Sequence, residues 1–108
     1  MRILIADDHE IIRSSVIRVL QSRADVECAE ATNGKEAVEK ALEWKPDLIL
    51  LDVRLPMLSG FDAAREIKRH QPDIPILKTF RRMPIDTLGR SIVTGLLRPI
   101  SVDAGNGA

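Results

Sequence analysis

The sequence predicts an α/β domain built on a doubly wound parallel sheet. Three short apolar runs, at residues 3–6, 48–51 and 74–77, do not alternate apolar with polar side chains, which is typical of strands buried on both faces. Stretches with helical periodicity separate the runs, and this alternation of strand and helix implies right-handed crossovers between parallel strands. A chain of 108 residues is long enough for one domain with a core of its own.

The first half of the chain supplies two strands and two helices. After the strand at residues 3–6, apolar side chains at helical spacing predict a buried stripe made of Ile12, Val16, Val19 and Leu20. Residues 26–29 form a weaker, edge-like strand. Asn33 and Glu36 are placed as the N-terminal capping pair of the next helix, which ends at Pro46. The buried stripe of that helix is Ala37, Val38, Ala41 and Leu42.

The second half repeats the pattern and then changes character. A strand at residues 48–51 is followed by a helix that ends at Gln71-Pro72 and by a strand at residues 74–77. The stripe of this helix is Phe61, Ala64 and Ile67.

Charge and composition shift beyond Leu77. Residues 1–77 carry 11 basic and 14 acidic side chains, whereas residues 78–108 carry five basic and two acidic ones and most of the glycines. We therefore predict a core over residues 1–77 and a divergent C-terminal segment over residues 78–108. Within that segment we expect a helix at residues 85–97, a short strand at residues 100–102 and a frayed end.

The composition argues against several classes of protein. The formal net charge is zero, which argues against direct DNA binding, because a nucleic-acid partner favours a basic face. The single cysteine, Cys28, cannot form an intrachain disulfide. No apolar run approaches the roughly 18 residues of a membrane span, and the N-terminus lacks the pattern of a secretion signal. We therefore expect a cytoplasmic protein that does not contact a membrane.

Acidic side chains stand at the ends of two predicted strands. Asp7 and Asp8 follow the strand at residues 3–6, and Asp52 follows the strand at residues 48–51. Ligands of an open parallel sheet bind outside the carboxyl ends of its strands. Three carboxylates gathered there repel one another unless a cation lies among them, and hard oxygen ligands suit Mg²⁺. The alternative is that each acid is only a turn former or a helix cap.

A longer motif surrounds the third acid. In the stretch DLILLDVRLPMLSG, residues 47–60, Asp52 is followed by Pro56 and then by Gly60. Together with ADDH at residues 6–9, this stretch resembles the receiver domain of bacterial response regulators, especially the LuxR-type transcription regulators. The resemblance covers Met1 to about Leu77. It implies a flavodoxin-like fold with strand order 2-1-3-4-5 and a role in two-component signalling.

The resemblance also implies roles for individual residues. Asp52 matches the phosphoacceptor, and Asp8 matches a direct Mg²⁺ ligand. Asp7 matches the acidic partner that acts largely through water, and Arg54 matches the position whose backbone carbonyl completes the metal site. The implied cofactor is Mg²⁺, and the implied partner is a sensor histidine kinase or a phosphotransfer protein. Such a chain is a signalling module rather than a turnover enzyme.

The switch residues of the family are not matched. Receivers carry a Thr or Ser at the end of the fourth strand and a Lys before a proline at the end of the fifth. Here Thr79 lies one place early, and Arg98 lies too close to Asp52 for the usual intervening elements, so we assign neither role. A truncated or divergent receiver that acts as an interaction protein, without a working phospho-switch, therefore stays open as an alternative. An uncovered apolar edge at residues 74–77 would favour a homodimer.

Two other classes of function fit the residues less well. The pattern also resembles that of a phosphatase of the haloacid dehalogenase type. Such an enzyme needs a second Asp two residues after its nucleophile, and this chain has Arg54 at that position. A flavodoxin-like cofactor binder would need small backbone donors after the first strand, where ADDHE presents carboxylates. We expect His9, beside the acidic pair, at the rim of the site rather than as a ligand, because no His or Cys stands at ligand spacing from it.

Overall fold

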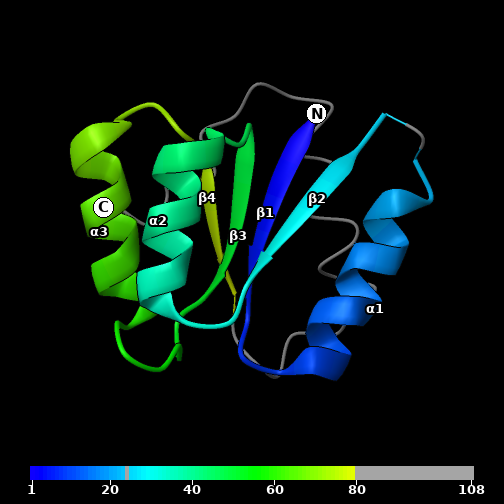
Figure 1. Ribbon diagram of the computed structural model, residues 1–108, viewed down its shortest axis with the longest axis horizontal. Helices are drawn as coiled ribbons and strands as arrows, with labels where there is room; N and C mark the ends of the chain where they lie inside the picture. The colour runs from blue at the N-terminus through cyan, green and yellow to red at the C-terminus, as the bar shows by residue number, and fades with distance from the viewer. Residues whose placement is uncertain (24, 80–108) are drawn as a thin grey trace.

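The protein is a parallel β-sheet enclosed by helices on both faces (Figure 1). The computed structural model describes residues 1–23 and 25–79. Within them strands and helices alternate along the chain: β1 (Arg2–Ala6), α1 (Glu10–Gln21), β2 (Glu27–Ala31), α2 (Gly34–Trp44), β3 (Leu48–Asp52), α3 (Gly60–His70) and β4 (Ile76–Thr79). The strands pair in parallel in the order β2-β1-β3-β4. This order confirms the doubly wound sheet and makes the first and third strands neighbours.

Some of the predicted features lie outside the described residues. They are the helix at residues 85–97, the strand at residues 100–102, the side chain of Arg98 and the chain end. The fifth strand of the expected order 2-1-3-4-5 belongs to the same group. Among the residues that the structure describes, no helix is both long enough and apolar enough to cross a membrane.

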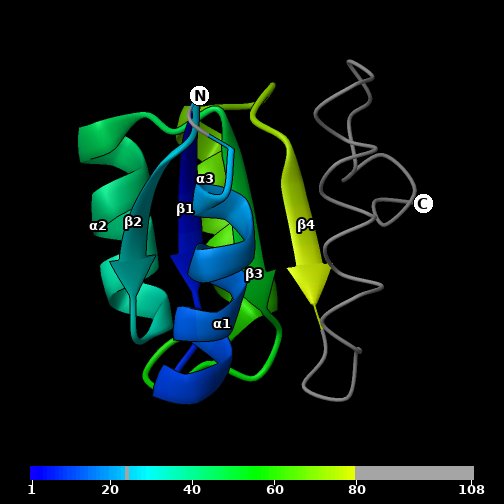
Figure 2. The ribbon, with the colours of Figure 1, turned by 90° about the vertical axis from the view of Figure 1, so that its right-hand side faces the viewer.

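Alternate side chains of the central strands fill two cores on opposite faces of the sheet. On β3, Ile49 and Leu51 pack toward α2 and α3, whereas Leu48 and Leu50 pack toward α1. Figure 2 shows α1 lying across the face that the viewer sees. The opposite face receives mostly small helix side chains: Ala37, Ala41, Ala63, Ala64 and Ile67. Burial on both faces explains why the strands are continuous apolar runs in the sequence.

The predicted bounds of β1 and β3 are right to within one residue, whereas those of β2 and β4 differ by up to two residues. β4 begins at Ile76, two residues later than expected, because Pro75 has no N–H to donate to the ladder. The carbonyl of Pro75 still accepts a hydrogen bond from the N–H of Ile49 at 3.1 Å. β2 runs from Glu27 to Ala31 rather than over residues 26–29, and lies at the edge of the sheet as expected.

Two members of the predicted apolar stripes face solvent instead of the core. Val19 is 43% exposed and Phe61 is 52% exposed. Val16 and Leu20 bury α1 against the sheet without Val19. The ring of Phe61 lies 5.6 Å from the ammonium group of Lys78, so this aromatic side chain makes a cation–π contact with β4.

The helices α2 and α3 begin with side-chain caps. The side chain of Asn33 accepts a hydrogen bond from the N–H of Glu36 at 2.8 Å, and the carboxylate of Glu36 accepts one from the N–H of Thr32 at 2.6 Å. The first of these bonds confirms the predicted cap at Asn33, whereas the Glu36 carboxylate binds the N–H of the residue before the cap. Ser59 caps α3 in the same way, with its hydroxyl 3.1 Å from the N–H of Asp62. Such caps satisfy backbone donors that the first helical turn leaves unpaired.

Candidate functional site

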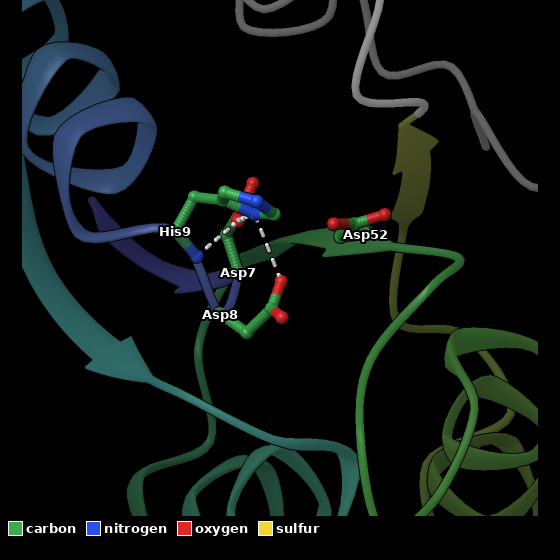
Figure 3. Close-up of side chains that lie close together, drawn as sticks. All are labelled: Asp7, Asp8, His9 and Asp52. Atoms are coloured by element: carbon green, nitrogen blue, oxygen red, sulfur yellow. Dashed lines mark hydrogen bonds and ion pairs between the residues drawn. The ribbon is translucent and has the colours of Figure 1, made fainter.

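Four ionisable side chains meet at the carboxyl edge of the sheet (Figure 3). Asp7, Asp8 and His9 come from the turn between β1 and α1, and Asp52 is the last residue of β3. Because β1 and β3 are parallel neighbours, the residues that end them arrive at the same place. One potential ligand atom from each of the four lies within 4.8 Å of the others. The structure therefore brings together the three carboxylates that the sequence placed at this edge.

Asp52 is fixed at the end of β3. Its residue surface is only 1% exposed, and its Oδ1 accepts a hydrogen bond from the backbone N–H of Arg54 at 2.9 Å. Pairing with β4 continues past the carboxylate, since the N–H of Val53 donates to the carbonyl of Thr79 at 3.1 Å. The direction of the Asp52 side chain is thus set by rigid backbone on both sides.

Asp7 is the second buried acid of the site. Its backbone N–H donates to the carbonyl of Ala31 on β2 at 3.0 Å, and its Oδ1 accepts from the N–H of His9 at 2.8 Å. Burial raises the pKa of Asp7, and the nearby charges of Asp52 and Asp8 raise it further, while the hydrogen bond from His9 lowers it. Repulsion among the carboxylates favours the binding of a cation between them.

Asp8 and His9 form the outer side of the cluster. The Nδ1 atom of His9 lies 3.0 Å from Oδ1 of Asp8 and 3.4 Å from Oδ1 of Asp7. The imidazole is 41% exposed, so it lies at the rim, where the sequence analysis expected it. Its contact with both carboxylates was not foreseen. Because His9 faces these acids, its side chain makes no capping hydrogen bond to α1.

The donors of the cluster fit a magnesium ion. The carboxylates of Asp7, Asp8 and Asp52 are hard oxygen ligands of the kind Mg²⁺ prefers. The exposed position of Asp8 leaves an open side for the waters that Mg²⁺ usually retains. Arg54, the expected backbone ligand, follows Asp52 by two residues, and its residue surface is exposed.

Thr79 lies closer to the site than its place in the sequence suggested. The register of β3 and β4 pairs Thr79 directly with Asp52, and Thr79 is 9% exposed. Paired residues of parallel strands project from the same face of the sheet. Thr79 is therefore a buried neighbour of the candidate phosphoacceptor, although the sequence analysis gave it no role.

Glycine is required where α3 meets β3. A Cβ added to Gly60 would fall well inside van der Waals contact with the carbonyl oxygen of Asp52 and would lie 2.6 Å from the Cα of Val53. The N–H of Gly60 also donates to the carbonyl of Val53 at 3.1 Å. Glycine is therefore needed at position 60 because the backbone of α3 approaches the backbone at the end of β3, next to Asp52.

The sequence analysis missed one residue that reaches the site. Nη1 of Arg13 donates to the carbonyl oxygen of Asp7 at 2.8 Å, and the Arg13 side chain is only 12% exposed. A signal was available, because Arg13 precedes Val16 by three residues and Leu20 by seven and so falls on the buried stripe of α1. A charged side chain on such a stripe needs polar partners.

The comparisons with known proteins agree on response regulators and their receiver domain. The family profile of the response regulator receiver domain matches residues 3–97. The response regulator GacA of Pseudomonas viridiflava is 37% identical over 81 residues, and the response regulator protein VraR of Staphylococcus aureus is 40% identical over 78 residues. Each match covers 71% of this chain but 36% or 37% of the relative, so the chain spans little more than a third of their length.

A solved structure gives the same result for the fold. The crystal structure of a LuxR-family two-component response regulator from Aurantimonas superimposes with a TM-score of 0.70 and 27% sequence identity. The alignment covers 87% of this chain and 68% of that one. The layers and strand order described above are therefore those of known receiver structures.

Proposed function

Because this chain belongs to the response regulator receiver domain family, we propose that it accepts a phosphoryl group on Asp52 and acts as a cytoplasmic signalling module of a two-component system. The donor is a phosphohistidine on a sensor histidine kinase or on a phosphotransfer protein. The observation that carries the proposal is the cluster of Asp7, Asp8 and Asp52, whose potential ligand atoms lie within 4.8 Å of one another.

The proposed reaction is a transfer from nitrogen to oxygen. A lone pair of the Asp52 carboxylate forms the new O–P bond while the P–N bond of the donor breaks, and the released imidazole nitrogen takes a proton from solvent. The hydrogen bond from Arg54 N–H to Oδ1, 2.9 Å long, holds one carboxylate oxygen and orients the other. A carboxylate in its ionised form attacks without losing a proton, so this step needs no general base.

The residues that would hold Mg²⁺ surround this carboxylate. Asp7, Asp8 and Asp52 supply side-chain oxygens, and the backbone carbonyl of Arg54 completes the set in this proposal. When bound, Mg²⁺ supplies charge neutralisation at the attacking carboxylate and at the phosphoryl oxygens. The raised pKa of Asp7, caused by burial and by its acidic neighbours, supports a cation at this place.

We also propose that the chain divides near residue 77 into a receiver core and a divergent C-terminal segment. The alignments with curated relatives cover 71% of the chain, and β4 carries the core slightly past this boundary, to Thr79. The family profile reaches residue 97, so the segment retains some family character.

Intact-mass analysis tests the proposed function. We expect wild-type protein incubated with a small-molecule phosphodonor and Mg²⁺ to gain one phosphoryl group, and to gain none when a chelator removes the metal. Asp52→Asn should gain none, because an amide is not a nucleophile toward phosphorus. The exposed Asp73 offers a matched control, and Asp73→Asn should behave like wild type. Wild-type protein that is folded, as judged by circular dichroism, but never phosphorylated would instead favour a receiver without a working phospho-switch.

A further inference from the structure

We propose that Arg13 is a positioning residue of the Mg²⁺ site, which fixes the peptide group between Asp7 and Asp8 and thereby aims both carboxylates. This inference rests on the proposed function, because it concerns the same metal site. Arg13 does not touch the phosphoryl group or the metal in this arrangement. It acts through the backbone of the turn that carries two of the ligands.

Two hydrogen bonds tie the guanidinium of Arg13 into place. Its Nη1 donates to the carbonyl oxygen of Asp7 at 2.8 Å, and its Nε donates to Oε1 of Glu30 on β2 at 2.6 Å. The backbone N–H of Arg13 also donates to the carbonyl of His9 at 2.9 Å. One residue of α1 thus binds the carbonyl groups at both ends of the turn from Asp7 to His9.

Asp8 depends on these contacts more than Asp7 does. Asp7 directly follows β1 and is still held to the sheet, since its N–H donates to the carbonyl of Ala31 at 3.0 Å. Asp8 lies beyond the last strand residue, between a peptide whose carbonyl is held by Arg13 and a peptide whose N–H is held by Oδ1 of Asp7. Because a peptide group is planar, fixing the carbonyl of Asp7 also fixes the direction in which the chain enters Asp8.

The chemistry of this position requires an arginine. A guanidinium presents several donors in a fixed plane, so it can bind a carboxylate and a carbonyl at the same time. Glu30 is the residue before Ala31, and Ala31 accepts the N–H of Asp7. The Arg13–Glu30 pair therefore ties the carbonyl of Asp7 to the same strand that already holds its N–H. Residues that orient metal ligands in this way typically change metal affinity by about 10- to 100-fold when they are replaced.

The same contacts would be present if the only role of Arg13 were to stabilise the packing of α1 against β2. Both roles predict a lower melting temperature when Arg13 is replaced, so stability alone does not distinguish them. The Mg²⁺ affinity of folded protein does, and the sign of its change is informative. Removing a positive charge near a cation site should strengthen Mg²⁺ binding by electrostatics alone, whereas loss of positioning should weaken it.

The test is a Mg²⁺ titration of the full chain. Binding is monitored through the backbone amide chemical shifts, at a temperature well below the melting temperature. We expect Arg13→Gln to weaken Mg²⁺ binding about tenfold, and Arg13→Lys, which keeps the charge, to weaken it by a smaller factor. Arg18 is exposed on the same helix, so Arg18→Gln removes the same charge without touching the turn. This control should bind Mg²⁺ like wild type.

Each outcome of the titration decides between the roles. Folded Arg13→Gln that binds Mg²⁺ as tightly as wild type, or more tightly, would overturn the role of Arg13 and leave the proposed function intact. If Arg13→Gln does not fold, Arg13→Lys decides by the same criterion. Wild-type protein that binds no Mg²⁺ would overturn the proposed metal site itself. Wild-type protein that binds Mg²⁺ but gains no phosphoryl group would overturn the proposed phosphotransfer and leave the role of Arg13 standing.

Discussion

The turns at the carboxyl edge of the sheet are built in two different ways. The turn after β1 carries Asp7, Asp8 and His9, and the helix that follows it starts without a side-chain cap. The turns after β2 and β3 lead into helices capped by Asn33 and Ser59. In the first turn the imidazole of His9 contacts the carboxylates of Asp7 and Asp8, whereas Asn33 and Ser59 accept hydrogen bonds from N–H groups of the helices that they cap. The turn that supplies two of the proposed metal ligands, Asp7 and Asp8, is thus the one whose helix lacks a side-chain cap, which agrees with the common trade-off between stability and function.

The largest effect should come from the close approach of α3 to the end of β3. Gly60→Ala would push a methyl group against the carbonyl oxygen of Asp52 and the Cα of Val53. Neither of these backbone atoms can move without distorting the end of β3. We expect a loss of about 3 kcal/mol in the free energy of unfolding, at the upper end of the cost of overpacking. Urea denaturation followed by circular dichroism measures this loss.

A substitution on the exposed side of the same helix provides the control. Arg65→Ala removes a side chain that is 76% exposed, so it should change stability by less than about 0.5 kcal/mol. If Gly60→Ala proved as stable as Arg65→Ala, the close approach of α3 to β3 would not constrain the fold, and the contrast between the turns would lose its main support.

A smaller effect should follow from removing a cap. Asn33→Ala deletes the acceptor that holds the N–H of Glu36 at 2.8 Å, and we expect it to cost about 1 kcal/mol. For a domain of this size such a loss lowers the melting temperature by roughly 4–8 °C. His9→Ala is the matched change at the start of α1, and it should cost less because His9 makes no capping hydrogen bond. Equal losses in the two variants would contradict the distinction between the turns.

Much of the fold could be predicted from the sequence because burial on both faces leaves a simple pattern. The apolar runs of β1 and β3 and the helix cap at Asn33 were identified correctly. Phe61 was misplaced because helical spacing alone cannot separate Ala63 and Ala64, which pack into the core, from an aromatic ring that turns toward Lys78. That choice depends on how close α3 lies to the sheet, which is a tertiary property.

Prediction of the candidate site from the sequence has the same limit. The sequence placed Asp7, Asp8 and Asp52 at strand ends, and parallel strands bring such ends together whatever the details of packing. The contact of Arg13 with Glu30 joins residues 17 positions apart and depends on the register of β2 against β1. Residue spacing therefore predicts which side chains end strands and places Arg13 on the buried stripe of α1, but it does not predict which groups Arg13 contacts there.

The smallest effect should have the opposite sign and lie in the binding turn. Asp7→Asn keeps an oxygen that can accept the N–H of His9 and removes a buried negative charge. The pKa of Asp7 is raised in the folded protein, first by burial and also by Asp52 and Asp8. The stability that its protonation provides is therefore complete below the unfolded pKa of about 3.9 and is lost as the pH rises through the higher folded value.

At pH 7 without metal, Asp7→Asn should consequently melt at a higher temperature than wild type, by less than Asn33→Ala lowers it, and the difference should vanish toward pH 3. Added Mg²⁺ should reverse the order, because binding stabilises the folded wild type and the variant lacks one of the proposed ligands. Thermal melts over a pH series, with chelator and with Mg²⁺, measure both effects. A variant less stable than wild type at pH 7 with chelator would show that Asp7 stabilises the turn, and the binding turn would then resemble its neighbours.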